Sequence, residues 1–258
     1  MSVPDELKPQ LYNTIVVVGG GCYGSYYVQQ LGRAARAGAI SAERVVVVDR
    51  DVECQVGRDL AAKSAEPSSL VVELVVAEWS DYFANYLGAA AANPSGVARD
   101  AIVPSPLMPH LMGEWIVNRA RERFPSRSVT PVPFDRPPVV PWERAGTDGT
   151  HYVSFATWMC PVNCIEPRIC PHTRDTRSWS MPERLAEHAA HEAIEGRPII
   201  VAALHCRHRA YGVGMFDTLE VIDAETRVIA AADRGSAEII VGTVSHCHGA
   251  LTRLLIAA

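Results

Sequence analysis

The stretch Thr14-Ile15-Val16-Val17-Val18-Gly19-Gly20-Gly21-Cys22-Tyr23-Gly24 decides the fold of the first half of this chain. Its β-branched run predicts a buried strand, and the residues from Ser25 to about Ala37 predict a helix immediately after the glycines. Gly19, Gly21 and Gly24 have the G-x-G-x-x-G spacing, which permits a tight turn and lets a pyrophosphate approach the amides of the helix N-terminus. The sequence therefore predicts a phosphate site at this turn.

Apolar runs with strand composition alternate with helical segments along the rest of the first half. Such alternation indicates parallel strands with helices on both faces of the sheet. We therefore expect an α/β fold with a doubly wound, mostly parallel sheet. The further strands are expected at 44–49, 70–76 and 100–103, and the helices at 81–92 and 107–124.

A proline-rich stretch separates the two halves of the chain. The prolines between residues 129 and 142 exclude a helix interior or a central strand there, so we expect one half at 1–128 and another at 129–258. The second half is expected to be α/β as well, with a cysteine-rich, metal-binding loop at 159–180. Its strands are expected at 151–156, 198–204 and 238–244, and its helices at 181–195, at 215–231 and from 249 to the C-terminus.

Residues 14–51 resemble the NAD(P)-binding Rossmann families, through Val-Val-Val-Gly-Gly-Gly-Cys-Tyr-Gly and Val-Val-Val-Val-Asp-Arg-Asp. The resemblance implies a Rossmann-like first half that binds NAD or NADP. Gly19, Gly21 and Gly24 would then hold the pyrophosphate and Asp49 the adenosine ribose, while Arg50 leaves the choice between NAD and NADP open. The alternative is a similar scaffold that binds another nucleotide or none, because a fold does not fix a function.

The same region is also similar to the adenylating superfamily that activates ubiquitin-like proteins with ATP. The similarity rests on the glycine turn, on Asp49-Arg50-Asp51-Val52, and on the downstream Arg58 and Lys63. The Ser-Asn-Leu-x-Arg pattern of that superfamily is absent, since residues 53–59 read Glu-Cys-Gln-Val-Gly-Arg-Asp. This departure ranks adenylation behind dinucleotide binding.

The second half carries a dense group of thiols at Cys160, Cys164 and Cys170, followed by His172. Thiolates at such spacings in a proline-stiffened loop can reach one metal ion, so we expect zinc or an iron-sulfur cluster. The spacing matches no standard zinc finger. The alternatives are cysteines buried as small apolar residues, or a redox-sensitive patch without metal.

Two His-Cys pairs each follow an apolar strand-like run, in His205-Cys206-Arg207-His208 and Ser245-His246-Cys247-His248. In parallel sheets, ligands bind at the carboxyl ends of the strands, where both pairs are expected to lie. Cys206 and Cys247 are therefore candidates for completing the metal site. His205, His208, His246 and His248 are candidates for proton transfer near neutral pH.

Composition limits the function further. The formal charge of -5 gives no electrostatic footprint for nucleic acid or for an anionic membrane. With neither a signal-peptide pattern at the N-terminus nor a membrane-spanning apolar run, we expect a cytoplasmic protein. In that compartment the seven cysteines favour metal ligands, reactive thiols or buried apolar residues over disulfides.

Together these features predict an NAD(P)-binding oxidoreductase that contains zinc or an iron-sulfur cluster and acts on a small molecule. The alternatives are a non-catalytic nucleotide or redox sensor with a structural metal, and an ATP-dependent adenylating enzyme. The expected partner is a small-molecule substrate rather than nucleic acid or a membrane, and the sequence leaves a homo-oligomer open.

Overall fold

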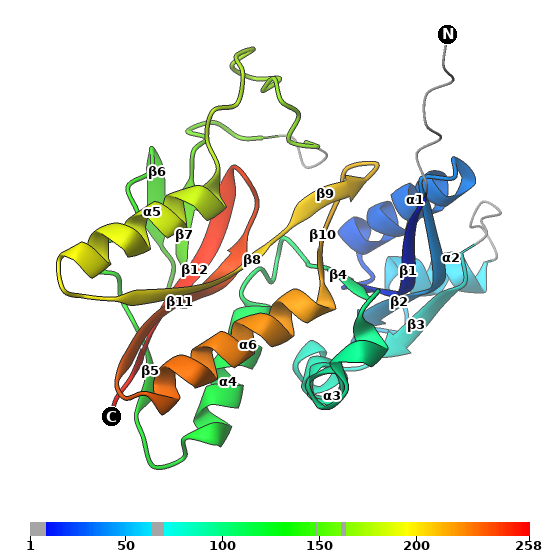
Figure 1. Cartoon of the computed structure of the whole chain (residues 1–258). Helices are drawn as coiled ribbons and strands as arrows, with labels where there is room; N and C mark the ends of the chain where they lie inside the picture. The colour runs from blue at the N-terminus through cyan, green and yellow to red at the C-terminus, as the bar shows by residue number, and fades with distance from the viewer. Residues whose placement is uncertain (1–8, 63–69, 148, 161–163) are drawn as a thin grey trace, which may run out of the picture. The chain divides into compact units, whose positions relative to one another are not determined.

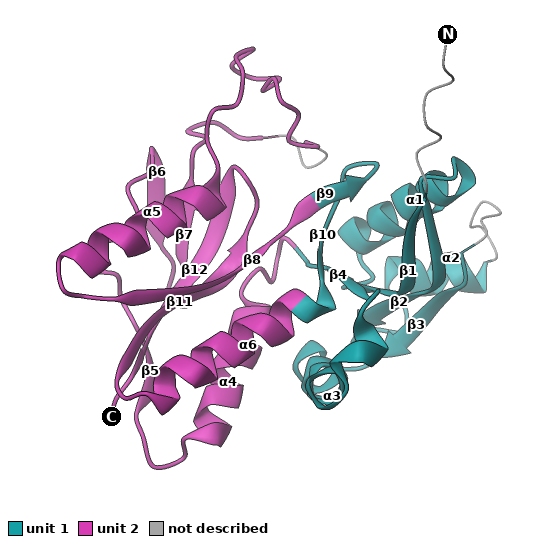
Figure 2. Cartoon of the chain, viewed as in Figure 1, with its two compact units in different colours: residues 1–105, 208–219 teal, residues 106–207, 220–258 magenta. Residues whose placement is uncertain are grey.

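The computed structural model describes residues 9–62, 70–147, 149–160 and 164–258. These residues form two mixed β-sheets and six α-helices, which confirms the α/β class expected from the sequence. The chain divides into two compact units (Figure 2). Unit 1 comprises residues 1–105 and 208–219, and unit 2 comprises residues 106–207 and 220–258. The units differ from the halves expected at the proline-rich stretch, because residues 208–219 return to the sheet of unit 1.

The sheet of unit 1 has the strand order β3-β2-β1-β4-β10-β9. β1 pairs in parallel with β2 on one side and β4 on the other, and β2 pairs in parallel with β3. β10 runs antiparallel to β4, so the sheet is mixed rather than wholly parallel. The strands are β1 (Gln10–Val18), β2 (Ile40–Asp49), β3 (Val72–Val76), β4 (Ala101–Val103), β9 (Arg207–Ala210) and β10 (Val213–Asp217).

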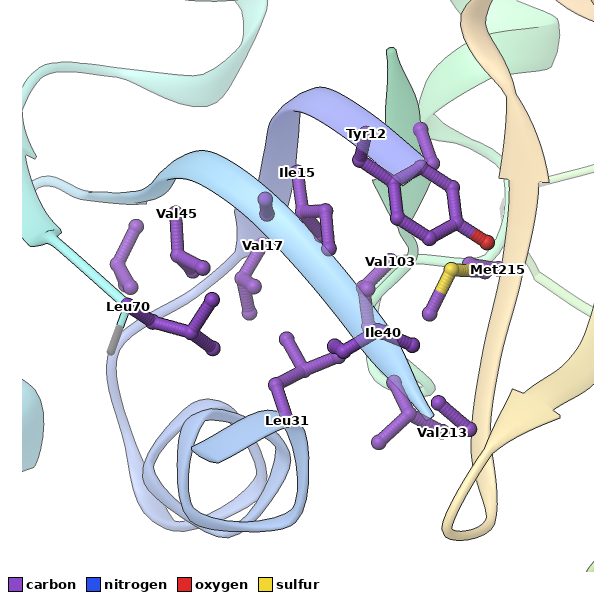
Figure 3. Close-up of a cluster of buried hydrophobic side chains, with 14 of the residues drawn as sticks. Tyr12, Ile15, Val17, Leu31, Ile40, Val45, Leu70, Val103, Val213 and Met215 are labelled. Atoms are coloured by element: carbon purple, nitrogen blue, oxygen red, sulfur yellow. The ribbon is translucent and has the colours of Figure 1, made fainter. Parts of the chain in front are cut away.

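The central strands of unit 1 are buried on both faces. Ile15 and Val17 of β1 lie in a cluster with Leu31 of α1 (Cys22–Arg36), which Figure 3 shows beneath β1 and β2. Val16, which points to the opposite face, is also fully buried. This explains why β1 and β2 read as continuous apolar runs. The other helices of this unit are α2 (Gln55–Ala61), α3 (Trp79–Ala92) and the 3-10 helix η1 (Pro94–Val97).

The sheet of unit 2 has the order β6-β7-β12-β11-β8, with β5 also paired to β12. β11 and β8 are parallel, whereas β12 is antiparallel to β11, β7 and β5. Its strands are β5 (Val129–Val132), β6 (Trp142–Ala145), β7 (His151–Ser154), β8 (Ile199–His205), β11 (Ala237–Val244) and β12 (His248–Ile256).

Helices cover both faces of this second sheet (Figure 1). Met181 and Leu185 of α5 (Met181–Ile194) pack in one cluster with Ile240 and Val244 of β11. The side chain of Val241 points to the face of the sheet opposite α5. On that face, Gly113 of α4 (Leu111–Arg123) lies next to Val241. α6 (Thr218–Asp233) lies beside α4, to which it is joined by an Arg119–Glu225 ion pair of 2.8 Å. The alternation of side chains along β11 thus assigns α5 and α4 to different faces.

The sequence-based prediction of a last helix from residue 249 is wrong. This segment is β12, a central strand that pairs along both edges. A short apolar run fits a buried helix or a buried strand equally well, and only the pairing decides between them. The helix expected at 215–231 begins later, at Thr218, because residues 213–217 form β10. Tyr211 and Gly212 have φ values of 47° and 82° and make the tight turn between β9 and β10.

None of the helices in the described part of the chain combines the length and the apolar character that crossing a membrane requires.

Candidate functional site

The glycine turn of unit 1 leads from β1 directly into α1. Gly19 has a φ of +86°, which favours glycine, and a Cβ on Gly24 would lie 1.9 Å from the Gly19 carbonyl oxygen. A Cβ on Gly21, by contrast, would meet no atom within 4 Å. Gly21 is the N-cap of α1, where no side chain caps the helix and no acidic residue occupies the first turn. The start of α1 therefore combines open space beside Gly21 with the absence of a capping side chain, which suits an anion site.

Asp49, at the end of β2, is fixed against this turn. One oxygen of its carboxylate accepts a hydrogen bond of 2.6 Å from the Gly20 amide, and the other accepts one of 2.9 Å from the Asp51 amide. The residue is buried, whereas Arg50 beside it is exposed. A carboxylate has about four acceptor positions, so Asp49 retains capacity for further donors.

The short helix α2 lies against the same turn, and sequence reasoning missed it. The Val56 amide donates to the Gly20 carbonyl over 2.9 Å, and a Cβ on Gly20 would lie 2.4 Å from the Cys54 Sγ atom. Ser25 of α1 donates to Asp59 of α2 over 2.9 Å. Seven residues are too few to show a helical apolar period, which explains the omission. Lys63, part of the resemblance to adenylating enzymes, lies outside the described residues.

In unit 2 the structure brings the two His-Cys pairs together at the carboxyl ends of β8 and β11. His205 pairs with Val244 across the parallel strands, and the Cys206 amide donates to the Val244 carbonyl over 2.7 Å. The rings of His205 and His246 meet edge to face, with centroids 4.7 Å apart. The structure therefore places these two candidate histidines in contact with each other, and their role stays a prediction.

The remaining two candidate histidines lie elsewhere. His208 lies in β9, within the part of the chain that belongs to unit 1. His248 begins β12, where its Nδ1 atom lies 2.9 Å from the hydroxyl of the buried Ser154. His248 and Ser154 are register partners in the antiparallel β7–β12 pair, so this contact joins the two strands. The Ser154 hydroxyl also hydrogen-bonds the amide and the carbonyl of Ala156.

Cys247 lies in the turn between β11 and β12 and is buried. Its Sγ atom accepts a hydrogen bond of 3.2 Å from Trp179, and its carbonyl accepts one of 2.9 Å from the Phe155 amide. Burial raises the pKa of the Cys247 thiol to about 11, against the lowering effect of the Trp179 indole. The thiol is therefore neutral at physiological pH.

We expect Cys247 to resist alkylation at neutral pH and to react faster as the pH approaches 11, because only the thiolate is nucleophilic. At pH 8 a pKa of about 11 leaves about one thiol in a thousand ionised. Iodoacetamide labelling followed by mass spectrometry at several pH values measures this, with the exposed Cys22 as internal reference. Equal labelling of both cysteines at pH 7 would contradict the assignment.

Glu166 connects the cysteine loop to this turn, and sequence reasoning missed it. Its carboxylate accepts hydrogen bonds from the Ser245 hydroxyl at 2.6 Å and from the His246 and Cys247 amides, both at 3.1 Å. Glu166 is buried and has a φ of 50°, in the left-handed region that is costly for this residue type. Its only sequence signal is that it is the single glutamate between residues 159 and 180. The loop thus reaches the second His-Cys pair.

Two of the loop thiols, Cys160 and Cys170, have pKa values shifted in opposite directions. Burial raises the pKa of Cys160, and the nearby Cys164 and Cys170 thiols and the Glu166 carboxylate raise it further. Hydrogen bonds from backbone amides, Thr173 first, lower the pKa of Cys170.

The predicted ligands do not, however, form one assembled metal site. Across residues 9–62, 70–147, 149–160 and 164–258, no three His, Cys, Asp or Glu side chains are arranged to hold a metal ion. The His172 ring stacks on Trp158, with centroids 4.5 Å apart and planes 7° from parallel. A metal held by Cys160, Cys164, Cys170, His172, Cys206 and Cys247 therefore stays a prediction.

Comparison with protein-family models found a match over residues 112–257, to AF_1314_C, described as "Uncharacterized protein, C-terminal domain". The chain belongs to the AF_1314_C family. The match includes the cysteine loop and both His-Cys pairs. This match corrects the expectation that the second half of the chain matches no named family. The assignment of the first half to the NAD(P)-binding Rossmann families is also wrong, since no such family was found. Glycine spacing in a strand-turn-helix element is too short a pattern to define a family. Neither the curated proteins nor the solved structures gave a match.

Proposed function

We propose that unit 1 binds an adenosine nucleotide with its phosphates at the glycine turn, and that the chain uses NAD(H) or NADP(H) to oxidise or reduce a small molecule. The observation that supports this best is the uncapped start of α1 at Gly21, with open space where a side chain would be. Aligned amides and the positive end of the helix dipole favour a phosphate there.

The strand order of unit 1 supports the same proposal. Four parallel strands in the order β3-β2-β1-β4 resemble a doubly wound sheet, although β10 and β9 extend it differently. After β1 the chain forms β2 and β3 on one side, and β4 lies on the other side. This change of direction makes the carboxyl end of β1 a topological switch point, where ligands bind in such sheets. The glycine turn begins there.

Within unit 2, the paired imidazoles of His205 and His246 are our candidates for proton transfer, because histidine is the side chain most often used as a general acid or base.

The Asp49 carboxylate leads us to expect NADH to bind at least about tenfold more tightly than NADPH. Its acceptor oxygens suit the two hydroxyls of an unphosphorylated ribose, whereas a 2′-phosphate would place a second negative charge beside it. Isothermal titration calorimetry with NADH and NADPH measures the ratio. Asp49→Asn should weaken NADH binding and reduce the preference, while Asp223→Asn, at an exposed position of unit 2, should change neither. Tighter binding of NADPH would overturn the ribose assignment.

A second candidate function is ATP-dependent adenylation, favoured by the position of α2. This helix follows Asp49-Arg50-Asp51 and lies against the glycine turn through the Val56–Gly20 hydrogen bond of 2.9 Å. It carries Arg58, whose guanidinium donates to Gln55 over 3.0 Å. A cationic side chain on this helix suits a triphosphate.

Direct measurement distinguishes the two functions. Binding of ATP with ATP–pyrophosphate exchange, and no binding of NADH or NADPH, would favour adenylation. Binding of a nicotinamide cofactor without exchange would favour the oxidoreductase. If neither ATP nor a nicotinamide cofactor binds, both proposals fail.

A further inference from the structure

Trp79 is the only tryptophan in the sequence of unit 1, and it packs against the glycine turn. It is the first residue of α3, which follows β3. Its indole nitrogen donates a hydrogen bond of 2.9 Å to the Val48 carbonyl, which also accepts one of 2.9 Å from the Gly19 amide. A single carbonyl oxygen at the end of β2 therefore holds both the indole and the start of the turn.

The indole meets the turn along one edge. A Cβ on Gly19 would lie 3.8 Å from the Cζ2 atom of Trp79, which is ordinary van der Waals contact. Cζ2 and the hydrogen-bonded Nε1 are both bonded to Cε2, so together they form the edge that is fixed against the turn. Trp79 is only partly buried, so the ring keeps exposed surface. A ring that is already fixed loses little side-chain freedom when a ligand stacks on it.

The space around the glycines separates a phosphate position from the position of the indole. A Cβ on Gly20 would lie 2.4 Å from the Cys54 Sγ atom, so this side of the turn is filled. A Cβ on Gly21 would meet no atom within 4 Å, so the open side lies at the start of α1. A phosphate is therefore expected beside Gly21, while Trp79 flanks the turn at Gly19.

The order of the strands matches the order of the groups in a nucleotide. The glycine turn follows β1, Asp49 ends β2 and Trp79 follows β3, and the sheet has these strands as neighbours in the order β3-β2-β1. A nucleotide likewise joins a phosphate to a ribose and the ribose to a flat aromatic base. With the phosphate at the turn and the ribose hydroxyls at Asp49, the base extends toward β3, where Trp79 lies.

We infer that Trp79 stacks on the adenine base of the nucleotide, an inference that rests on the nucleotide site proposed for the glycine turn. Each base has a π-face, so stacking on an aromatic side chain adds affinity without reading the identity of the base. Adenosine is common to NADH, NADPH, ADP and ATP. The contact therefore serves the oxidoreductase and the adenylating enzyme equally, and ADP is a suitable probe for both.

The test is calorimetry on the full chain with ADP and with inorganic pyrophosphate. Trp79→Leu should weaken ADP binding by about 10- to 100-fold, because the stacking partner is lost. Pyrophosphate has no base, so its affinity should change by less than about twofold. Trp79→Phe keeps an aromatic face and should lose less ADP affinity than Trp79→Leu. Trp142→Leu, which removes a 42% exposed tryptophan of unit 2, is the matched control and should change neither affinity.

Fluorescence of the native chain keeps the inference testable if Trp79→Leu fails to fold. ADP should quench tryptophan emission of the native chain more strongly than that of Trp79→Phe, whereas pyrophosphate should quench neither. Native ADP affinity in Trp79→Leu would overturn the inference, and so would an equal loss of ADP and pyrophosphate binding, which would assign the indole to the shape of the turn alone. If the native chain binds neither ADP nor pyrophosphate, the nucleotide site itself fails, which is a different result.

Discussion

Gly24→Ala is expected to lower the free energy of unfolding by about 3 kcal/mol and to abolish nucleotide binding at the glycine turn. The added Cβ would lie 1.9 Å from the Gly19 carbonyl oxygen, and this neighbour is backbone, which cannot rotate away. Relief of the clash must move α1 away from β1. The amides at the start of α1 would then leave the geometry in which they converge on a phosphate. Denaturant unfolding and calorimetry with NADH and ATP measure the two effects.

Gly88→Ala is the matched control for this prediction. Gly88 lies within α3 of the same unit, and a Cβ there would meet no atom within 4 Å. Alanine is the better helix former by roughly 0.8–1.0 kcal/mol, so this variant should be somewhat more stable and should bind nucleotide normally. If Gly24→Ala were as stable as the native chain and bound nucleotide equally well, the described turn geometry would be refuted.

Glu166→Ala is expected to destabilise unit 2 by about 3 kcal/mol. The carboxylate accepts hydrogen bonds from the Ser245 hydroxyl and from the amides of His246 and Cys247, and its removal leaves these donors in a partly buried turn. Hydrogen bonds to a charged group contribute more than neutral ones, so several lost together should exceed the effect of an ordinary surface change. Amide hydrogen exchange at His246 and Cys247 should accelerate most.

Two variants separate the role of this carboxylate from its charge. Glu166→Gln keeps one acceptor oxygen and should lose less stability than Glu166→Ala. Asp175→Ala removes the same charge from an exposed position of the same loop and should change stability by less than about 0.5 kcal/mol. Similar losses for Glu166→Ala and Asp175→Ala would show that Glu166 does not anchor the loop.

Much of the fold could be predicted from local patterns. The strand at 14–18, the glycine turn and the following helix were predicted because β-branched residues, glycine spacing and helix formers act over a few neighbouring positions. The expected strands at 44–49 and 238–244 are confirmed for the same reason. The error at 249–258 has the opposite origin, since β12 owes its conformation to pairing with β11, β7 and β5, which lie far away along the chain.

The candidate sites divide in the same way. Local sequence placed His205 and His246 at strand ends, and the parallel pairing of β8 and β11 then brings their rings to 4.7 Å. Local sequence did not identify Glu166, because this buried carboxylate is stabilised by hydrogen-bond donors about 80 residues further along the chain. Nor did it indicate that residues 208–219 rejoin the first sheet, which depends on the pairing of β10 with β4.

By itself, then, the sequence determined the α/β class, most of the helices and strands, the glycine turn and the clustering of three thiols in the cysteine loop. These properties follow from short-range sterics, side-chain periodicity and the chemistry of residue types. Only the tertiary structure decided the two mixed sheets, the strand formed by residues 248–256, the contact between the two histidines and the anchoring of the loop by Glu166. Those depend on hydrogen bonds and packing between distant segments, which local sequence does not encode.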